Sequence, residues 1–344
     1  MPKMTADQKA AIATRDEAED DSLPIATAPA HGQRVQKVTS SDLFGSLEDD
    51  TDFYNWLMYG PQGSGKTTAA CKAANHGKIL VIRAEGGLKK QALASHGIDV
   101  SNIYVYPAKQ GTRVRKEDLI AVHEQLLTDL QNDPTSWYAV VLDSVTEIHH
   151  TLREDATKQR VARVLNRLTD PAKLAEFDED FIDRDDYGKM TGQLREILRD
   201  YRDLPCHTIM TALQKVDDDT KENTPAITPA LRIDLMGYVD ILTAHKSDDD
   251  VFRALTRKTD KTAAKDRFNL LPKVWAEPNF DRLVEYMEGK LTPTTDPVQT
   301  TFEADQEAAR QQREAEAAAK EEAKKAVRTR RTTAKKTTDT ESAE

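Results

Sequence analysis

Short apolar runs alternate with segments of helical spacing along the middle of the chain. The apolar runs lie at 55–60, 78–85, 102–108, 137–145 and 206–214. Between them, residues 66–76 and 117–131 have the composition or the apolar spacing of helices. This alternation predicts an α/β domain in which a mainly parallel central sheet is covered by helices on both faces. Two later runs, at 238–246 and 251–258, have hairpin spacing and predict antiparallel strands added at one edge of the sheet.

The composition divides the chain into three parts. Residues 1–50 carry the run "RDEAEDDS", and so polar a segment buries too little apolar surface to offset the entropy of ordering. We therefore expect a disordered acidic N-terminal segment over 1–50 and an ordered core over 51–290. Residues 291–344 are expected to form a charged tail, part exposed helix (305–325) and part disordered. The basic run of this tail, "KKAVRTRRTTAKK" at 324–336, contains Arg328, Arg330 and Arg331.

Bulk charge and cysteine content narrow the class of protein. The formal net charge of −10 over 344 residues disfavours wholesale affinity for nucleic acid and leaves any such binding to local patches. Cys71 and Cys206 are far apart and show no metal-ligand spacing, which fits a reducing compartment. No apolar run approaches the ~20 residues that a membrane helix needs. We expect a soluble cytoplasmic protein without a membrane partner.

The stretch "GPQGSGKT" satisfies the phosphate-loop pattern, with Gly60, Gly65, Lys66 and Thr67 at the required spacing. It also follows an apolar strand and opens a helix. Its glycines let backbone amides turn inward around phosphate oxygens. Lys66 adds a positive charge, and the Thr67 hydroxyl is suited to ligate magnesium. The pattern therefore predicts ATP and Mg²⁺ as cofactors. The predicted nucleotide-binding residues are Gly60, Pro61, Gln62, Gly63, Ser64, Gly65, Lys66, Thr67 and Thr68.

Two carboxylates stand at the ends of predicted strands. Asp143 ends the run "YAVVLD", which places it at the carboxyl edge of the sheet beside the phosphate loop, where it can hold the magnesium shell. Glu85 ends the run "KILVIRAE", where it can orient and activate the attacking water. The alternative readings are a turn residue for Asp143 and a solvated strand end for Glu85.

From this point the sequence resembles a known family. The order of "ILVIRAEGGLKKQALASHGIDVSNIYVYPA" and "WYAVVLDSVTEI" is similar to the RecA superfamily of recombination ATPases. The resemblance implies a RecA-like P-loop NTPase core with Glu85 as catalytic base, Asp143 as magnesium-side carboxylate and Ser144 beside it. It also implies that Gln214, at the end of "TIMTALQ", senses the γ-phosphate and couples it to a DNA-binding loop.

The segments "DDYGKMTGQLREILRDYRDLPCHTIMTALQ" and "PALRIDLMGYVDILTAHK" look more specifically like the small RecA-like ATPases of bacteriophages, which include Sak-type single-strand annealing proteins. The resemblance covers roughly residues 55–275. That resemblance implies a magnesium-dependent ATPase acting in DNA recombination in the bacterial host cytoplasm. Single-stranded DNA is the implied ligand, and a homo-oligomer, ring or filament, the implied assembly. A single-strand-binding protein is a further candidate partner.

The sequence departs from the family pattern at two places. The family places an aromatic residue that stacks on adenine shortly after the catalytic Glu, but "GGLKKQALA" at 86–94 has none. Base stacking must therefore come from elsewhere or be weak. The loop 215–228, where the family contacts DNA, contains Asp217, Asp218, Asp219 and Glu222, which would repel phosphates.

Cations elsewhere offer three candidate contacts with anions. Arg160, Arg163 and Arg167 share one helix face and could meet DNA phosphates, although a solvated face is at least as good a reading. Arg328, Arg330 and Arg331 of the basic tail form the more persuasive patch, with an aid to solubility as the alternative. Lys258 and Lys261 lie near the position from which the family reaches a neighbouring subunit's ATP; a cationic edge strand is the plainer reading.

Other nucleotide-binding classes fit less well. A GTPase should show an N/T-K-x-D motif that recognises the guanine base. The nearest candidate, "RKTD" at 257–260, has Arg where the motif requires Asn or Thr. An AAA+ machine would normally pair the strand-end Asp with an adjacent Glu, where Ser144 stands, and a nucleotide kinase leaves Glu85 unexplained. We therefore rank a RecA-type ATPase first. The rival is a nucleotide-dependent regulatory or scaffolding ATPase that does not act on DNA.

Overall fold

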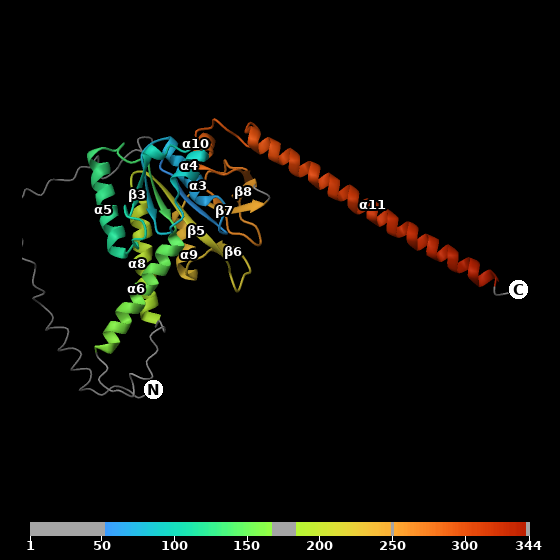
Figure 1. The fold of residues 1–344 in the computed structure, drawn as a ribbon, viewed down its shortest axis with the longest axis horizontal. Coiled ribbons are helices and arrows are strands. Elements are labelled where there is room, and N and C mark those ends of the chain that lie inside the picture. The colour runs from blue at the N-terminus through green and yellow to red at the C-terminus, as the bar shows by residue number, and fades with distance from the viewer. Residues whose placement is uncertain (1–51, 167–183, 249–250, 342–344) are drawn as a thin grey trace, which may run out of the picture. The chain divides into compact units, whose positions relative to one another are not determined.

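A mixed β-sheet with a parallel centre forms the framework of the chain (Figure 1). The computed structural model describes residues 52–166, 184–248 and 251–341, with side chains of the last helix as far as Glu321. The predicted disordered segment 1–50 lies outside the described residues. The strands are β1 (Asn55–Gly60), β2 (Ile79–Arg83), β3 (Ile103–Tyr106), β4 (Ala139–Asp143), β5 (His207–Val216), β6 (Asn223–Pro225), β7 (Ile241–Asp248), β8 (Val251–Leu255), β9 (Lys265–Asp266) and β10 (Val274–Ala276).

The order of strands across the sheet is β10-β8-β7-β1-β5-β4-β2-β3. Pairing is parallel from β7 to β3 and antiparallel where β8, β9 and β10 join. The predicted parallel sheet with an antiparallel edge is thus confirmed. One detail differs, because β7, the first strand of the predicted edge hairpin, itself runs parallel to β1 and only its partner β8 turns back.

Helices cover both faces of this sheet (Figure 1). The helical elements are α3 (Lys66–Cys71), η2 (Lys72–Asn75), α4 (Lys90–Ser95), η3 (Val100–Asn102), α5 (Lys116–Asn132), α6 (Val145–Leu165), α8 (Arg184–Arg202), α9 (Pro229–Tyr238), α10 (Phe280–Met287) and α11 (Pro297–Glu341). Alternate side chains of each central strand enter opposite cores, as the two-residue period of a strand requires. Leu57 and Tyr59 pack with α5, α6, α8 and α9, whereas Trp56 and Met58 pack with α3, η2 and α10.

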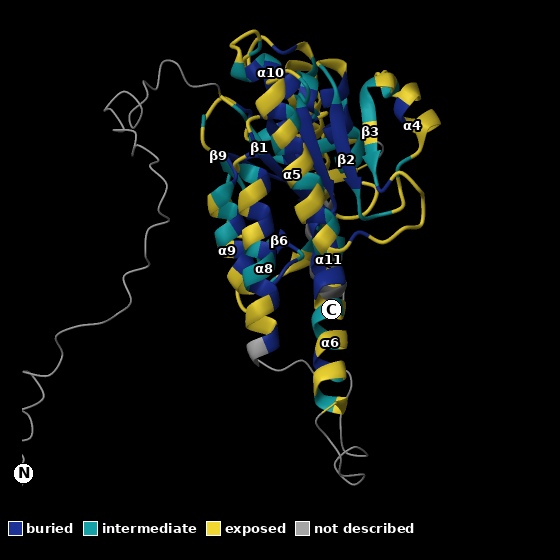
Figure 2. Cartoon of the chain, turned by 90° about the vertical axis from the view of Figure 1, so that its left-hand side faces the viewer, coloured by how far each residue is buried: buried dark blue, intermediate teal, exposed yellow. Residues whose placement is uncertain are grey.

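The central strands are therefore hydrophobic on both sides and buried along their length (Figure 2). This explains why they read in the sequence as continuous apolar runs and not as alternating ones. The shorter strands β6, β9 and β10 have no such signal, and the sequence did not predict them. They pair with β5, β7 and β8, respectively.

The tail begins as part of the packed core and continues as an exposed helix. Buried Gln299 accepts a hydrogen bond from the backbone N–H of Ala276 at 3.0 Å and donates one to the carbonyl of Val274 at 2.9 Å, which fixes the start of α11 on β10. Residues 303–321 are exposed, as predicted for the helix at 305–325. The backbone of the basic run 324–336 continues α11, but its side chains lie outside the described residues.

Trp56 gives a test of the core on the α3 side. Its ring is fully buried, its indole N–H donates to the Thr243 hydroxyl at 2.8 Å, and it lies 5.7 Å from the ring of Trp275. We expect Trp56→Ala to lower the free energy of unfolding by about 3–5 kcal/mol, because it leaves a cavity and removes one of the two hydrogen bonds of the Thr243 hydroxyl, the other being to His245. Urea denaturation measures this loss. Ile233→Ala, at a 70% exposed position of α9, is the control and should change the free energy by no more than about 0.5 kcal/mol.

Candidate active site

The carboxyl ends of β1, β2, β4 and β5 meet at one edge of the sheet and surround a cavity of about 270 Å³. Because these strands are parallel, the residues that follow each of them come together there. The cavity is lined by Gln62, Gly63, Ser64, Gly65, Lys66, Thr67, Thr68, Glu85, Asp143, Ser144, Thr211, Leu213 and Phe252. The predicted phosphate loop and both predicted carboxylates thus share one cavity.

The phosphate loop needs glycine at particular positions. Gly63 and Gly65 have φ angles of 76° and 78°, in the left-handed region that other residues rarely adopt. Gly60 has no room for a side chain, because a Cβ there would lie 2.4 Å from the carbonyl oxygen of His245 on β7. These glycines let the loop turn tightly out of β1 while remaining in contact with the neighbouring strand.

Lys66 lies against its own loop. Its ammonium donates hydrogen bonds to the carbonyls of Gly60 at 3.0 Å and Pro61 at 2.8 Å, and to the Ser64 hydroxyl at 3.2 Å. Burial lowers the pKa of Lys66, and the nearby carboxylates of Glu85 and Asp143 act in the opposite direction. The Lys66 ammonium is therefore held at the opening of the loop, where phosphate oxygens of a ligand would compete with these three acceptors for its hydrogen bonds.

Asp143 is the most buried carboxylate of the cavity, with 4% of its surface exposed. Its oxygens accept hydrogen bonds from the Thr67 hydroxyl at 3.0 Å and from the Thr211 hydroxyl at 2.5 Å. Burial raises the pKa of Asp143, while these two hydroxyls lower it in part. A hydroxyl and a carboxylate oxygen in contact are hard donors of the kind that Mg²⁺ takes alongside substrate phosphates. Thr67 and Asp143 thus fit the predicted magnesium site.

Glu85 reaches the same cavity from β2. Ser144 donates a short hydrogen bond from its hydroxyl to Glu85 Oε1, and the Glu85 backbone N–H donates to the Asp143 carbonyl at 3.0 Å. The Ser144 hydroxyl also accepts from the backbone N–H of Glu147 at 3.3 Å and so caps the start of α6. The residue beside the strand-end aspartate therefore holds the carboxylate of the neighbouring strand in place.

Gln214 lies within β5, which continues to Val216, and does not line the cavity. Thr211 and Leu213 of the same strand do line it. The Gln214 amide instead donates a hydrogen bond to the Asn223 side chain on β6 at 2.8 Å. In this structure its contact is with β6, and a role as γ-phosphate sensor stays a prediction.

The acidic loop after Gln214 is held by its own ion pairs. Asp217 accepts from the backbone N–H of Thr220 at 2.9 Å and pairs with Arg232 of α9, and both contacts lower the pKa of Asp217. Glu222 pairs with Lys258 at 3.7 Å, so this predicted trans-acting lysine contacts its own chain's loop. Lys261 is exposed, and its carbonyl accepts from the Asn223 backbone at 2.7 Å.

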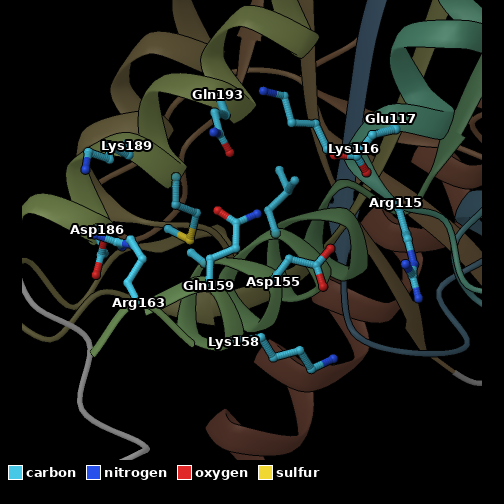
Figure 3. A pocket seen from close by; sticks show the side chains of 13 residues that line it. Arg115, Lys116, Glu117, Asp155, Lys158, Gln159, Arg163, Asp186, Lys189 and Gln193 are labelled. Atoms are coloured by element: carbon cyan, nitrogen blue, oxygen red, sulfur yellow. The ribbon is translucent and has the colours of Figure 1, made fainter. Parts of the chain in front are cut away.

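The predicted arginine stripe is not an exposed row of cations. Arg160 is only 6% exposed, and Arg163 is paired with Asp186 of α8. The helical period had placed both on one face, but α8 packs against that part of α6. Arg163 lines a cavity of about 550 Å³ between α5, α6 and α8, in which carboxylates accompany the cations (Figure 3). The other predicted DNA contacts, Arg167, Arg328, Arg330 and Arg331, have side chains outside the described residues.

Three residues of the cavity were missed in the sequence: Thr211, Leu213 and Phe252. Thr211 sits inside an apolar strand, and its polarity within "TIMTAL" was the available signal. Phe252 comes from β8, which approaches the loop only because the β7–β8 hairpin folds back beside β1. No local pattern indicates that approach.

Because the Asp143 carboxylate is buried, we expect its replacement by a neutral side chain to stabilise the ligand-free protein. The folded protein holds a proton on this carboxyl more tightly than the unfolded chain does. Its contribution therefore favours folding below the ordinary aspartate pKa of about 4 and is lost as pH rises through the raised pKa of the folded state. We expect ligand-free Asp143→Asn to have a higher Tm than the parent protein at pH 7.5, with the difference shrinking toward pH 4.

Thermal unfolding in a chelator measures this difference. Asp129→Asn is the control of opposite sign, since hydrogen bonds from Trp137 and Gln125 lower the pKa of Asp129. A lower Tm for Asp143→Asn than for the parent at pH 7.5 would contradict the account.

Comparison with known proteins identifies the family of the chain. A family model described as an AAA domain, AAA_24, matches residues 52–268. The crystal structure of the RadB recombinase is similar at 15% sequence identity, with a TM-score of 0.37, covering 59% of this chain and 79% of that chain. No curated protein sequence matches. Within the described residues, every helix is too short or too polar to cross a membrane. With more than half of its length matched, the chain belongs to the AAA_24 family of AAA domains.

Proposed function

We propose that this protein is a magnesium-dependent ATPase whose cycle serves DNA recombination. The observation that carries the hydrolytic part is the convergence of Lys66, Thr67, Glu85 and Asp143 on one cavity. They come from the ends of three different strands, and a contact of 3.0 Å joins the Thr67 hydroxyl to the Asp143 carboxylate. A cation, two oxygens suited to the metal and a further carboxylate are the groups that hydrolysis of a phosphoanhydride requires.

Each group has a distinct role in the proposed reaction. The loop amides and the Lys66 ammonium bind the phosphate oxygens. Thr67 and Asp143 would hold Mg²⁺, which when bound neutralises charge on the β- and γ-phosphates. Glu85 accepts a proton from the water whose oxygen attacks the γ-phosphorus, as the bond from that phosphorus to the bridging oxygen breaks. Ser144 fixes the direction of the Glu85 carboxylate through their hydrogen bond.

The finer part of the proposal concerns DNA. The segments at 185–214 and 229–246 resemble the phage RecA-like ATPases, and the basic run 324–336 offers a salt-sensitive tether for single-stranded DNA. We therefore propose a cytoplasmic, phage-type protein that binds or anneals single strands as a homo-oligomer.

Three observations favour the rival, a regulatory or scaffolding ATPase without direct action on DNA. The acidic loop is tied to Arg232 and Lys258. Arg160 is buried, and Gln214 contacts β6 instead of the cavity. In this reading the same hydrolytic site would switch the affinity for a protein partner.

Glu85→Gln tests the catalytic base. The amide keeps the shape of the side chain but cannot accept the proton, so we expect ATP hydrolysis to fall by about 10²–10⁴-fold while ATP binding persists. Steady-state phosphate release and equilibrium binding measure the two effects. Glu117→Gln, outside the cavity, should hydrolyse ATP at the parental rate. Parental turnover by Glu85→Gln would remove Glu85 from the mechanism.

A titration with single-stranded oligonucleotide separates the two functions. We expect anisotropy to show binding whose log K falls linearly with log salt concentration, and replacement of Arg328, Arg330 and Arg331 by alanine to flatten that slope by about 2. Absence of salt-sensitive binding by the full chain, with or without ATP, would refute the DNA function and favour the regulatory rival.

A further inference from the structure

A second cavity opens directly beside the phosphate cavity. Its volume is about 380 Å³. The two cavities share four lining residues: Ser64, Gly65, Thr68 and Phe252. Three of the four belong to the loop that would hold the phosphates and to the first turn of α3. A ligand that starts in the phosphate cavity can therefore continue along α3 into the second one.

Phe252 stands at the junction of the two cavities. A Cβ built on Gly65 would lie 2.9 Å from Cδ1 of this ring and 3.2 Å from Cε1, so the ring lies directly against the loop. The strand that carries it is held in place, because the Phe252 carbonyl accepts a hydrogen bond from the Glu277 backbone N–H at 2.8 Å. The side chain is only half-buried and presents apolar surface to the cavity.

The remaining walls of the second cavity are polar and mixed in charge. Lys72 and His96 approach from the α3 and α4 side, and Glu277 and Asn279 from the segment before α10. His245 contributes a fully buried ring, and burial lowers its pKa to about 3, so it is neutral at physiological pH. An aromatic wall with hydrogen-bonding groups of both kinds suits a flat heterocycle better than it suits further phosphates.

We propose that the second cavity receives the nucleoside part of the nucleotide and that Phe252 is the residue against which its base packs. This inference rests on the proposed ATPase function. It supplies the aromatic contact that the segment 86–94 lacks, from a hairpin some 160 residues further along the chain. Stacking on an aromatic side chain is worth about 1–3 kcal/mol per base in nucleic-acid complexes, which corresponds to roughly fivefold to 150-fold in affinity.

The test compares two ligands that share a triphosphate, ATP and inorganic tripolyphosphate, each with Mg²⁺ and measured by calorimetry. We expect Phe252→Ala to weaken ATP binding by roughly tenfold or more and to leave tripolyphosphate binding unchanged. Phe252→Tyr keeps the aromatic face and should bind ATP within about threefold of the parent protein. Val251→Ala is the matched control, because successive strand residues point to opposite faces and Val251 lines neither cavity.

The outcomes separate this inference from the function on which it rests. Parental affinity of Phe252→Ala for ATP, while the parent protein binds both ligands, would overturn the role of Phe252 alone. Equal loss of both ligands in that variant would also overturn it, since the ring would then support the loop and not the base. If the parent protein bound neither ligand, that result would refute the phosphate site and also the proposed ATPase function.

Discussion

The buried Asp143 carboxylate joins the phosphate loop to the middle of the sheet. It accepts from Thr67 of α3 and Thr211 of β5, so one charged group links three segments far apart in the chain. A buried charge of this kind opposes folding unless it is hydrogen-bonded. The hydroxyls satisfy it only in part, and its pKa remains raised by burial. The fold thus maintains a group that a bound cation would satisfy more completely, and the rest of the site is arranged around it.

The parts of the site that follow strand–turn–helix patterns could be predicted from sequence. The phosphate loop, Asp143 and Glu85 each end an apolar run, and parallel strands bring such ends together whatever lies between them. Their placement in one cavity was therefore foreseeable. Their chemical roles remain predictions.

The parts that depend on packing between distant elements could not be predicted. Helical spacing placed Arg160 and Arg163 on one face, but only tertiary structure decides that Arg160 is buried and that Arg163 pairs with Asp186 of α8. From its composition, the loop after Gln214 was expected to repel anions. In the structure, Arg232 and Lys258 form ion pairs with two of its acidic residues. The Gln214 side chain points toward β6 because it is hydrogen-bonded to Asn223. The Phe252 ring reaches Gly65 because the β7–β8 hairpin folds back beside β1. Ser144 marked a departure from the AAA+ pattern in sequence; in the structure it holds the Glu85 that arrives from β2.

The position of β1 within the sheet has a consequence for how the molecule opens. Strand β1 is paired on both sides, with β5 and β7, whereas β8 is separated from it by β7 and borders the short strand β10. Local unfolding starts where fewer contacts hold a segment, so β8 and β10 should exchange their amide hydrogens with solvent before β1 does. The loop after β1 and the ring of Phe252 touch one another but belong to regions of unequal local stability. A ligand bound to both would slow the opening of the outer strands, and its departure could begin there while the loop stays folded.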